Sequence, residues 1–194
     1  MSVYELRQYT LHPGRRDELI ELFERELIEP QEAAGMELLG LFRDLDDADR
    51  FVWIRGFADM ESRRDALAAF YGGPVWKRHR QAANATMIDS DNVLLLRLAC
   101  GTSFPRTIAS PMVHITTFSF DAPVDDGVVE AIHRDLRPLT ILRTESAPNT
   151  FPALPVREGE NVVVTITADA VSAPNAHRLR LEPTRRSAMS VHRQ

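Results

Sequence analysis

The sequence predicts an α+β fold of two tandem ferredoxin-like modules, each with the element order βαββαβ. Three observations predict it. Residues 2–100 show the order strand, helix, strand, strand, helical pair, strand, and a similar order begins again after 110. The first strand also carries charged and aromatic side chains on one face, which is typical of a sheet that encloses something. We therefore expect two antiparallel sheets that face each other.

The first strand spans residues 3–11, and its side chains alternate between two faces. Glu5, Arg7 and Tyr9 share one face, while Tyr4 and Leu6 point the other way. We expect the polar face to line the space between the two sheets.

A helix and a hairpin follow in the first module. Leu19, Leu22, Phe23 and Leu27 form one apolar stripe of an amphipathic helix, which Pro30 ends or kinks. Residues 37–45 and 50–57 then alternate as two strands around a turn of short polar residues.

Two helices and a strand complete this module. Asp59 can cap a helix that ends before Gly72, and Pro74 suits the first turn of the next helix. The apolar run 92–100 predicts the last strand. The module is therefore expected to span residues 1–100.

Residues 101–110 lack periodicity and predict a linker. The second module, 111–194, is expected to contain a strand at 112–120, a helix at 125–136, and strands at 139–146 and 161–167. A short, broken helix at 168–175 and a strand at 177–182 would make this repeat degenerate.

Composition excludes several classes of protein. The net charge of −5 argues against a nucleic-acid partner, and no run is apolar and long enough for a membrane span. One cysteine, Cys100, rules out an intrachain disulfide, which favours a cytoplasmic location. The six histidines show no metal-ligand spacing, so we expect neither a metal nor another cofactor.

Three motifs of the first module resemble the NIPSNAP family. They are Tyr4-Glu5-Leu6-Arg7-Gln8-Tyr9-Thr10-Leu11-His12-Pro13-Gly14, Phe51-Val52-Trp53-Ile54-Arg55-Gly56-Phe57 and Gly73-Pro74-Val75-Trp76-Lys77-Arg78-His79-Arg80. Residues 154–160 and 178–187 look like the double-module, bacterial-type branch of that family. The resemblance implies a dimeric α/β barrel, here with both sheets from one chain. The wider superfamily includes cofactor-free monooxygenases and haem-handling enzymes, but the family itself has no agreed reaction.

Strand alternation and the resemblance together give the candidate site residues. Those expected to bind a ligand in the barrel interior are Glu5, Arg7, Tyr9, Phe51, Trp53, Arg55 and Arg97. Converging arginines need a carboxylate, water or an anionic ligand. A purely structural pairing of Glu5 with Arg7 or Arg55 is the alternative.

Two histidines are candidates for proton transfer. His79 shares a helical face with Trp76, and His114 falls at the position of Glu5 when the first strands of both modules are superposed. For each of them, a packing or hydrogen-bonded role is the alternative.

Two functions remain open at this stage. One is the binding of a small anionic or enolic molecule with an aromatic or apolar body, with or without cofactor-free catalysis. The other is a non-catalytic protein-interaction module with a structural polar interior. The sequence does not decide whether the protein is an enzyme, and it leaves a homodimer open.

Overall fold

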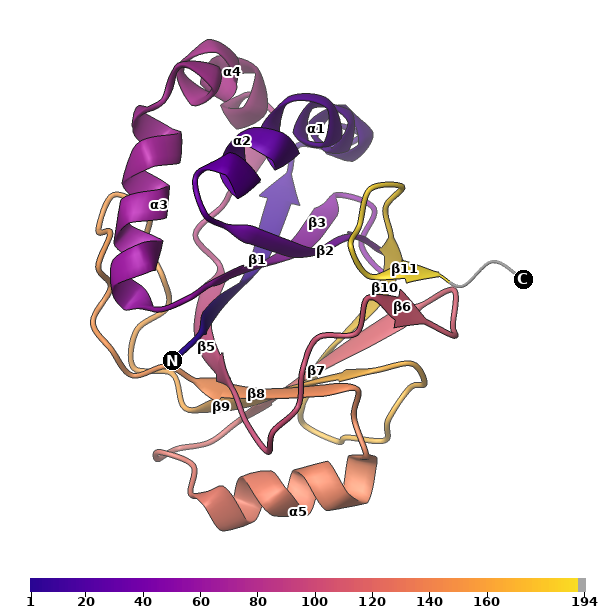
Figure 1. Cartoon of the computed structure of the whole chain (residues 1–194). Coiled ribbons are helices and arrows are strands. Elements are labelled where there is room, and N and C mark those ends of the chain that lie inside the picture. The colour runs from indigo at the N-terminus through magenta and orange to yellow at the C-terminus, as the bar shows by residue number, and fades with distance from the viewer. Residues whose placement is uncertain (192–194) are drawn as a thin grey trace.

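Eight strands of the computed structural model, which describes residues 1–191, close into one antiparallel barrel (Figure 1). Around the barrel the order is β3-β2-β10-β7-β9-β8-β5-β1, and the pairing of β1 with β3 closes it. The strands are β1 (Val3–Leu11), β2 (Glu37–Asp44), β3 (Arg50–Phe57), β5 (Val93–Leu98), β7 (Val113–Ser119), β8 (Thr140–Thr144), β9 (Val162–Thr167) and β10 (His177–Pro183).

The barrel consists of two similar sheets joined edge to edge. In the first module the strand order is β5-β1-β3-β2, and in the second it is β10-β7-β9-β8. The pairings β2–β10 and β5–β8, both antiparallel, join the two sheets. Two ferredoxin-like units with facing antiparallel sheets are therefore confirmed, while the boundaries 1–100, 101–110 and 111–194 stay a prediction.

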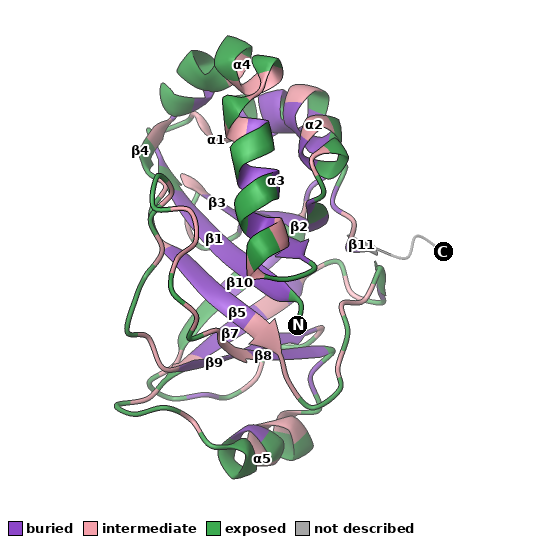
Figure 2. Cartoon of the chain, turned by 60° about the vertical axis from the view of Figure 1, so that its left-hand side comes forward, coloured by how far each residue is buried: buried purple, intermediate pink, exposed green. Residues whose placement is uncertain are grey.

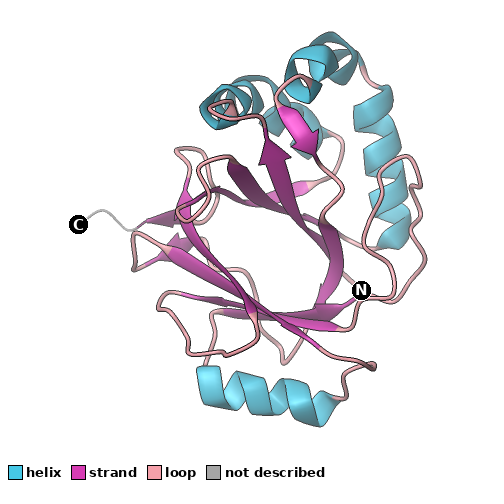
Figure 3. Ribbon diagram, turned by 180° about the vertical axis from the view of Figure 1, so that it is seen from behind, coloured by secondary structure: helices cyan, strands magenta, loops and turns pink. Residues whose placement is uncertain are grey.

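Helices lie only on the outside of the strands, with most of them over the first sheet (Figure 3). They are α1 (Arg16–Leu22), the π-helical turn η1 (Phe23–Leu27), α2 (Ile28–Ala33), α3 (Met60–Gly72), α4 (Pro74–Asn84) and, over the second sheet, α5 (Asp126–Leu136). Caps fix two of these starts, because the side chains of Asp59 and Asp125 accept hydrogen bonds from Ser62 N and Val128 N.

The predicted helix at 168–175 is wrong, since this segment contains no helix and connects β9 to β10 as a loop. Pro174 and the left-handed conformation of Asn175 (φ 67°) break any helical path there. Three short strands, β4 (Met87–Asp89), β6 (Thr107–Ile108) and β11 (Ser190–Val191), were not predicted. Strands of two or three residues are too short for a visible alternation.

The barrel interior is packed with apolar side chains from both modules. Most residues of the strands that enclose it are buried (Figure 2). From the first module come Leu6, Val52, Ile54, Leu94 and Leu96, and from the second Val113, Ile115, Leu142, Val164 and Leu179. The expectation of a polar interior is therefore wrong. Most inward side chains meet apolar groups of the opposite sheet, where an unpaired charge would be costly.

A second apolar core lies between the first sheet and its helices. Leu19, Phe23 and Leu27 from α1 and η1, with Leu67 and Phe70 from α3, pack on Leu41, Phe51 and Trp53 of the strands. Among the described residues, no helix has the length and hydropathy required to cross a lipid bilayer.

Candidate functional site: a buried arginine cluster

The predicted polar residues of β1 and β3 do lie together, but under the helices. The antiparallel register sets Glu5 opposite Arg55, Arg7 opposite Trp53 and Tyr9 opposite Phe51. All six belong to the sheet face that packs against the helix layer, because the alternate residues, such as Leu6 and Ile54, fill the barrel. The expected place of these residues in the barrel interior is thus wrong.

Glu5 is the centre of a buried ion cluster. Its Oε2 accepts hydrogen bonds from Arg7 Nη1 and from Arg55 Nε, both at 2.7 Å. Its Oε1 accepts one from Arg63 Nε, also at 2.7 Å. The four side chains are at most 1% exposed. One carboxylate therefore holds three guanidinium groups out of contact with water.

Sequence reasoning missed Arg63. It lies on α3, where Ala66, Leu67 and Phe70 are also buried. The spacing 63, 66, 67, 70 is that of a single helix face, so an arginine at the start of an apolar stripe was the available signal.

Neutral groups provide further contacts to Arg7 and Arg55. Arg7 Nε donates to the Tyr9 hydroxyl at 3.1 Å, and Arg55 Nη1 donates to Gln31 Oε1 at 3.1 Å. Both guanidinium groups lie near the Trp53 ring, whose centroid is 5.4 Å from Arg7 Cζ and 5.0 Å from Arg55 Cζ. These cation–π contacts stabilise the positive charges, although they do not neutralise them.

The charges of the cluster shift the pKa values of its members. Burial alone would raise the pKa of Glu5, but Arg55, Arg7 and Arg63 hold it well below its usual range. Burial lowers the pKa of Arg63, and the charges of Arg55 and Arg7 act in the same direction. Burial also raises the pKa of the Tyr9 hydroxyl, which stays protonated. Glu5 is consequently a weak base, and the Tyr9 hydroxyl, which accepts a hydrogen bond from Arg7 Nε, keeps its proton.

The cluster carries more positive than negative charge. Among the described residues, Glu5 is the one carboxylate that forms an ion pair with these three arginines. Two positive charges therefore lack a counter-charge. In addition, Arg55 Nη2 and Trp53 Nε1 are buried donors with no hydrogen-bond partner in the described part of the chain.

A small aromatic pocket lies beside the cluster. It has a volume of about 30 Å³ and is lined by residues that include Tyr9, Gln31, Trp53, Phe70, Tyr71 and Trp76. A water molecule requires roughly 10–15 Å³ of such volume. The pocket therefore has room for a small group.

The remaining predicted residues lie elsewhere. Arg97 on β5 is half-buried, and its Nη1 is 3.7 Å from Met1 Sδ. His79 on α4 has its Nε2 3.6 Å from Glu26 Oε2. His114 faces outward from β7, opposite Arg180 of β10, and burial lowers its pKa. Neither histidine belongs to the cluster or lines the aromatic pocket.

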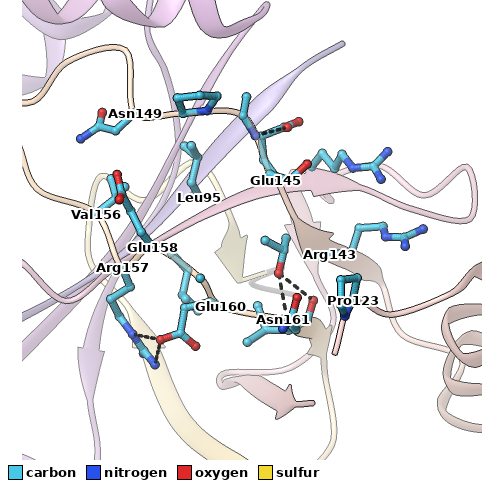
Figure 4. A pocket seen from close by; sticks show the side chains of 18 of the residues that line it. Leu95, Pro123, Arg143, Glu145, Asn149, Val156, Arg157, Glu158, Glu160 and Asn161 are labelled. Carbon is cyan, nitrogen blue, oxygen red and sulfur yellow. Dashed lines mark hydrogen bonds and ion pairs between the residues drawn. The ribbon is translucent and has the colours of Figure 1, made fainter. Parts of the chain in front are cut away.

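A larger pocket of about 490 Å³ lies where β5 meets β8. Figure 4 shows Leu95 between two arms of one chain segment, with Glu145 on one arm and Val156 on the other. Arg157 pairs there with Glu160 at 2.7 Å. In residues 1–191, no group of three or more His, Cys, Asp or Glu side chains could hold a metal ion.

Fold and cluster define a single-chain α/β barrel of two ferredoxin-like modules with a buried cationic site in the first. The family model that matches this sequence is NIPSNAP, over residues 4–100, half of the 194 residues. The chain belongs to the NIPSNAP family. A comparison with curated proteins found no match.

Solved structures support the same architecture. A NIPSNAP family protein from Agrobacterium tumefaciens is 18% identical, with a TM-score of 0.50 over 54% of this chain and 100% of that chain. A protein from Lactobacillus acidophilus, named as a proposed monooxygenase, is 13% identical, with a TM-score of 0.54 over 94% of this chain and 93% of that chain. One from Fusobacterium nucleatum, named likewise, is 9% identical, with a TM-score of 0.57 over 94% of this chain and 92% of that chain. At these identities the likeness concerns the fold alone.

Proposed function

We propose that the first module binds a small organic anion, a carboxylate or an enolate, between its sheet and its helix layer. The observation that carries this proposal is the excess of two positive charges among Arg7, Arg55 and Arg63 around the single carboxylate of Glu5. Unpaired charges in a dry site are costly, and a bound anion would relieve that cost.

The surroundings support a ligand with an aromatic or apolar body. Tyr9, Trp53 and Tyr71 are walls of the pocket beside the cluster, and Trp53 Nε1 is a donor without a partner among the described residues. Apolar walls with a few convergent polar groups are the usual composition of small-molecule sites. The anionic group would lie between Arg55 Nη2 and Arg63, and the body would lie against the rings.

The same contacts suit either binding alone or catalysis on an enolic substrate. Guanidinium groups that are fixed in advance stabilise negative charge as it develops on an oxygen. However, the low pKa of Glu5 makes that carboxylate a poor base, so the cluster supports anion binding more directly than proton abstraction.

The proposal is tested by isothermal titration calorimetry, in which the protein is titrated with benzoate and related aromatic carboxylates. Arg55→Gln should raise the Kd at least tenfold, because it removes the Arg55 Nη2 donor, which has no hydrogen-bond partner among the described residues. Arg64→Gln is the matched control, since Arg64 lies on α3 with its side chain 50% exposed. It should bind as the wild type does.

A second variant tests the site with a smaller change, in case Arg55→Gln does not fold. Trp53→Phe removes the Nε1 donor and keeps an aromatic ring, and we expect a several-fold weaker Kd with the fold retained. Equal affinity in Arg55→Gln, Trp53→Phe and wild type would refute the proposed site.

The second candidate function is a non-catalytic interaction module. It is favoured by the packed barrel interior and by α4, where Ala83 is the buried residue and the side chains of Lys77, Arg78 and Arg80 are mostly outside the core. If the wild type binds none of the carboxylates, the arginine cluster is structural, and a surface such as α4 becomes the better candidate for function.

A further inference from the structure

The connection between β8 and β9, residues 145–161, is a long segment that we term the strap. Both of its ends are fixed on β5 of the first module: Glu145 N donates to Leu95 O and Arg157 N donates to Val93 O, each at 2.9 Å. The corresponding connection of the first module, between β2 and β3, spans only residues 45–49. The extra length carries the strap across the junction of β5 and β8 to α3, as the orange segment beside that helix in Figure 1 shows.

The tip of the strap contacts the arginine cluster itself. Arg63 Nη1 donates to Asn149 Oδ1 at 3.0 Å and to Thr150 Oγ1 at 3.3 Å. The Thr150 hydroxyl in turn donates to Met60 O at 3.0 Å, which fixes the tip to the start of α3. The side-chain oxygens of Asn149 and Thr150, both neutral, thus accept hydrogen bonds from the guanidinium group of Arg63.

The strap also contacts a wall of the aromatic pocket. Phe151 stacks on Tyr71 with ring centroids 6.2 Å apart and an interplanar angle of 28°. Tyr71 lines the aromatic pocket and lies 6.0 Å from Arg55 Cζ. Leu154 packs against the same apolar core. Displacement of the tip would therefore uncover Tyr71 and Arg63 together.

The 490 Å³ pocket borders the cluster on the side of the strap. Asn149 and Leu95 are both among its lining residues, and Leu95 is the strand partner of Glu5. Arg63 has no exposed side-chain surface in this closed form. A ligand in the larger pocket is thus separated from the cluster by the strap tip and Leu95.

We propose that the strap is the gate of the first module's anion site, and that Asn149 and Thr150 hold the position on Arg63 which the anionic group of the ligand takes. This inference rests on the proposed function. A carboxylate binds a guanidinium group more strongly than neutral amide and hydroxyl oxygens do, so an arriving anion displaces the tip. The anion reaches Arg63 from the larger pocket, and Phe151 and Tyr71 then contact its apolar body.

The gate is tested by stopped-flow measurements of benzoate binding, with tryptophan fluorescence as the signal. The double variant Asn149→Ala/Thr150→Val removes the competing oxygens and the tether to Met60. We expect its association rate constant to rise at least threefold and its Kd to fall. Asn161→Ala is the control, because Asn161 lines the same pocket without a hydrogen bond to Arg63, and it should leave both constants unchanged.

Hydrogen exchange of the free protein gives a readout that needs no ligand. The Leu154 amide, which donates to Phe151 O at 3.0 Å, should exchange at least tenfold faster than amides of β9, because the tip opens without unfolding of the barrel. Exchange of Leu154 at the β9 rate, or an unchanged association rate in the double variant, overturns the gate. If Arg55-dependent binding of benzoate persists, only the gate has failed; if the wild type binds no carboxylate, the proposed function fails and the gate with it.

Discussion

Glu5 and Leu6 are neighbours in β1 that lie in two equally dry environments of opposite chemistry. Glu5 is 0% and Leu6 1% exposed. Leu6 faces a barrel interior in which both modules contribute hydrocarbon, whereas Glu5 faces helices from which Arg63 reaches it. Burial alone therefore does not decide whether a charge is tolerated. What decides it is whether the facing element can supply long side chains with hydrogen-bonding groups.

The outer faces of the two modules differ in a similar way. In β7, His114 points outward with Thr167 and Arg180 as its strand partners, where β1 has Glu5 with Arg55 and Leu95. In the described part of the chain the second sheet carries one helix, α5, and a loop takes the place of the predicted helix at 168–175 (Figure 3). Without a second helix, that face has no counterpart of Arg63 on α3, and the ion cluster belongs to the first module.

The largest expected effect comes from Glu5→Gln, which would remove the one carboxylate that, among the described residues, pairs with the three arginines. Three buried guanidinium groups would then lack their carboxylate, and loss of one partner from a buried pair typically costs about 3–5 kcal/mol. We expect urea unfolding to show a decrease of this size. Glu61→Gln, which removes an exposed partner of Arg64, should be indistinguishable from wild type. A decrease below about 1 kcal/mol for Glu5→Gln would mean that the arginines have another counter-charge.

Acid should reduce the stability that the Glu5 face of β1 contributes more than that of the Leu6 face. Because the pKa of Glu5 is lowered in the folded state, the stability that this group contributes is complete above its unfolded pKa of about 4.3 and declines as the pH falls further. The decline is about 1.4 kcal/mol per pH unit for one such group. Urea unfolding between pH 6 and pH 3 should show this slope in wild type and lose it in Glu5→Gln.

Leu6→Ala is the control for the acid experiment. It should cost about 2–5 kcal/mol at every pH, because it leaves a cavity in an apolar core and removes no titrating group. Its acid slope should therefore equal that of wild type. If Glu5→Gln keeps the full slope, other carboxylates dominate the acid response.

Sequence alternation correctly grouped Glu5, Arg7, Trp53 and Arg55 on one sheet face but assigned that face to the wrong side of the sheet. Period-two patterning separates two faces and says nothing about which of them a helix layer will cover. The choice required knowledge that the alternate residues of both modules meet inside one barrel. The contacts of Arg63 with residues 149 and 150, far apart in sequence, leave no local pattern at all.

The smallest expected effect concerns His114, the second module's equivalent of Glu5. Burial lowers its pKa below 6.5, so the neutral imidazole is favoured in the folded protein. Because the pKa of His114 is lower in the folded state than in the unfolded state, His114 contributes a small stability at high pH. This contribution is lost as the pH falls through the unfolded pKa. A titration of the imidazole resonances by NMR should place the midpoint below 6.5.

His114→Gln then separates the two modules functionally. His114 belongs to the second sheet and forms no contact with the arginine cluster, so its replacement should change the Kd for benzoate by less than twofold. Arg55→Gln, measured alongside, should show the large loss. A midpoint at or above 6.5 would show that burial does not set the pKa of His114. A loss of binding in His114→Gln comparable to that in Arg55→Gln would restore His114 as a site residue, and it would mean that the outward faces of the two modules act on the ligand together.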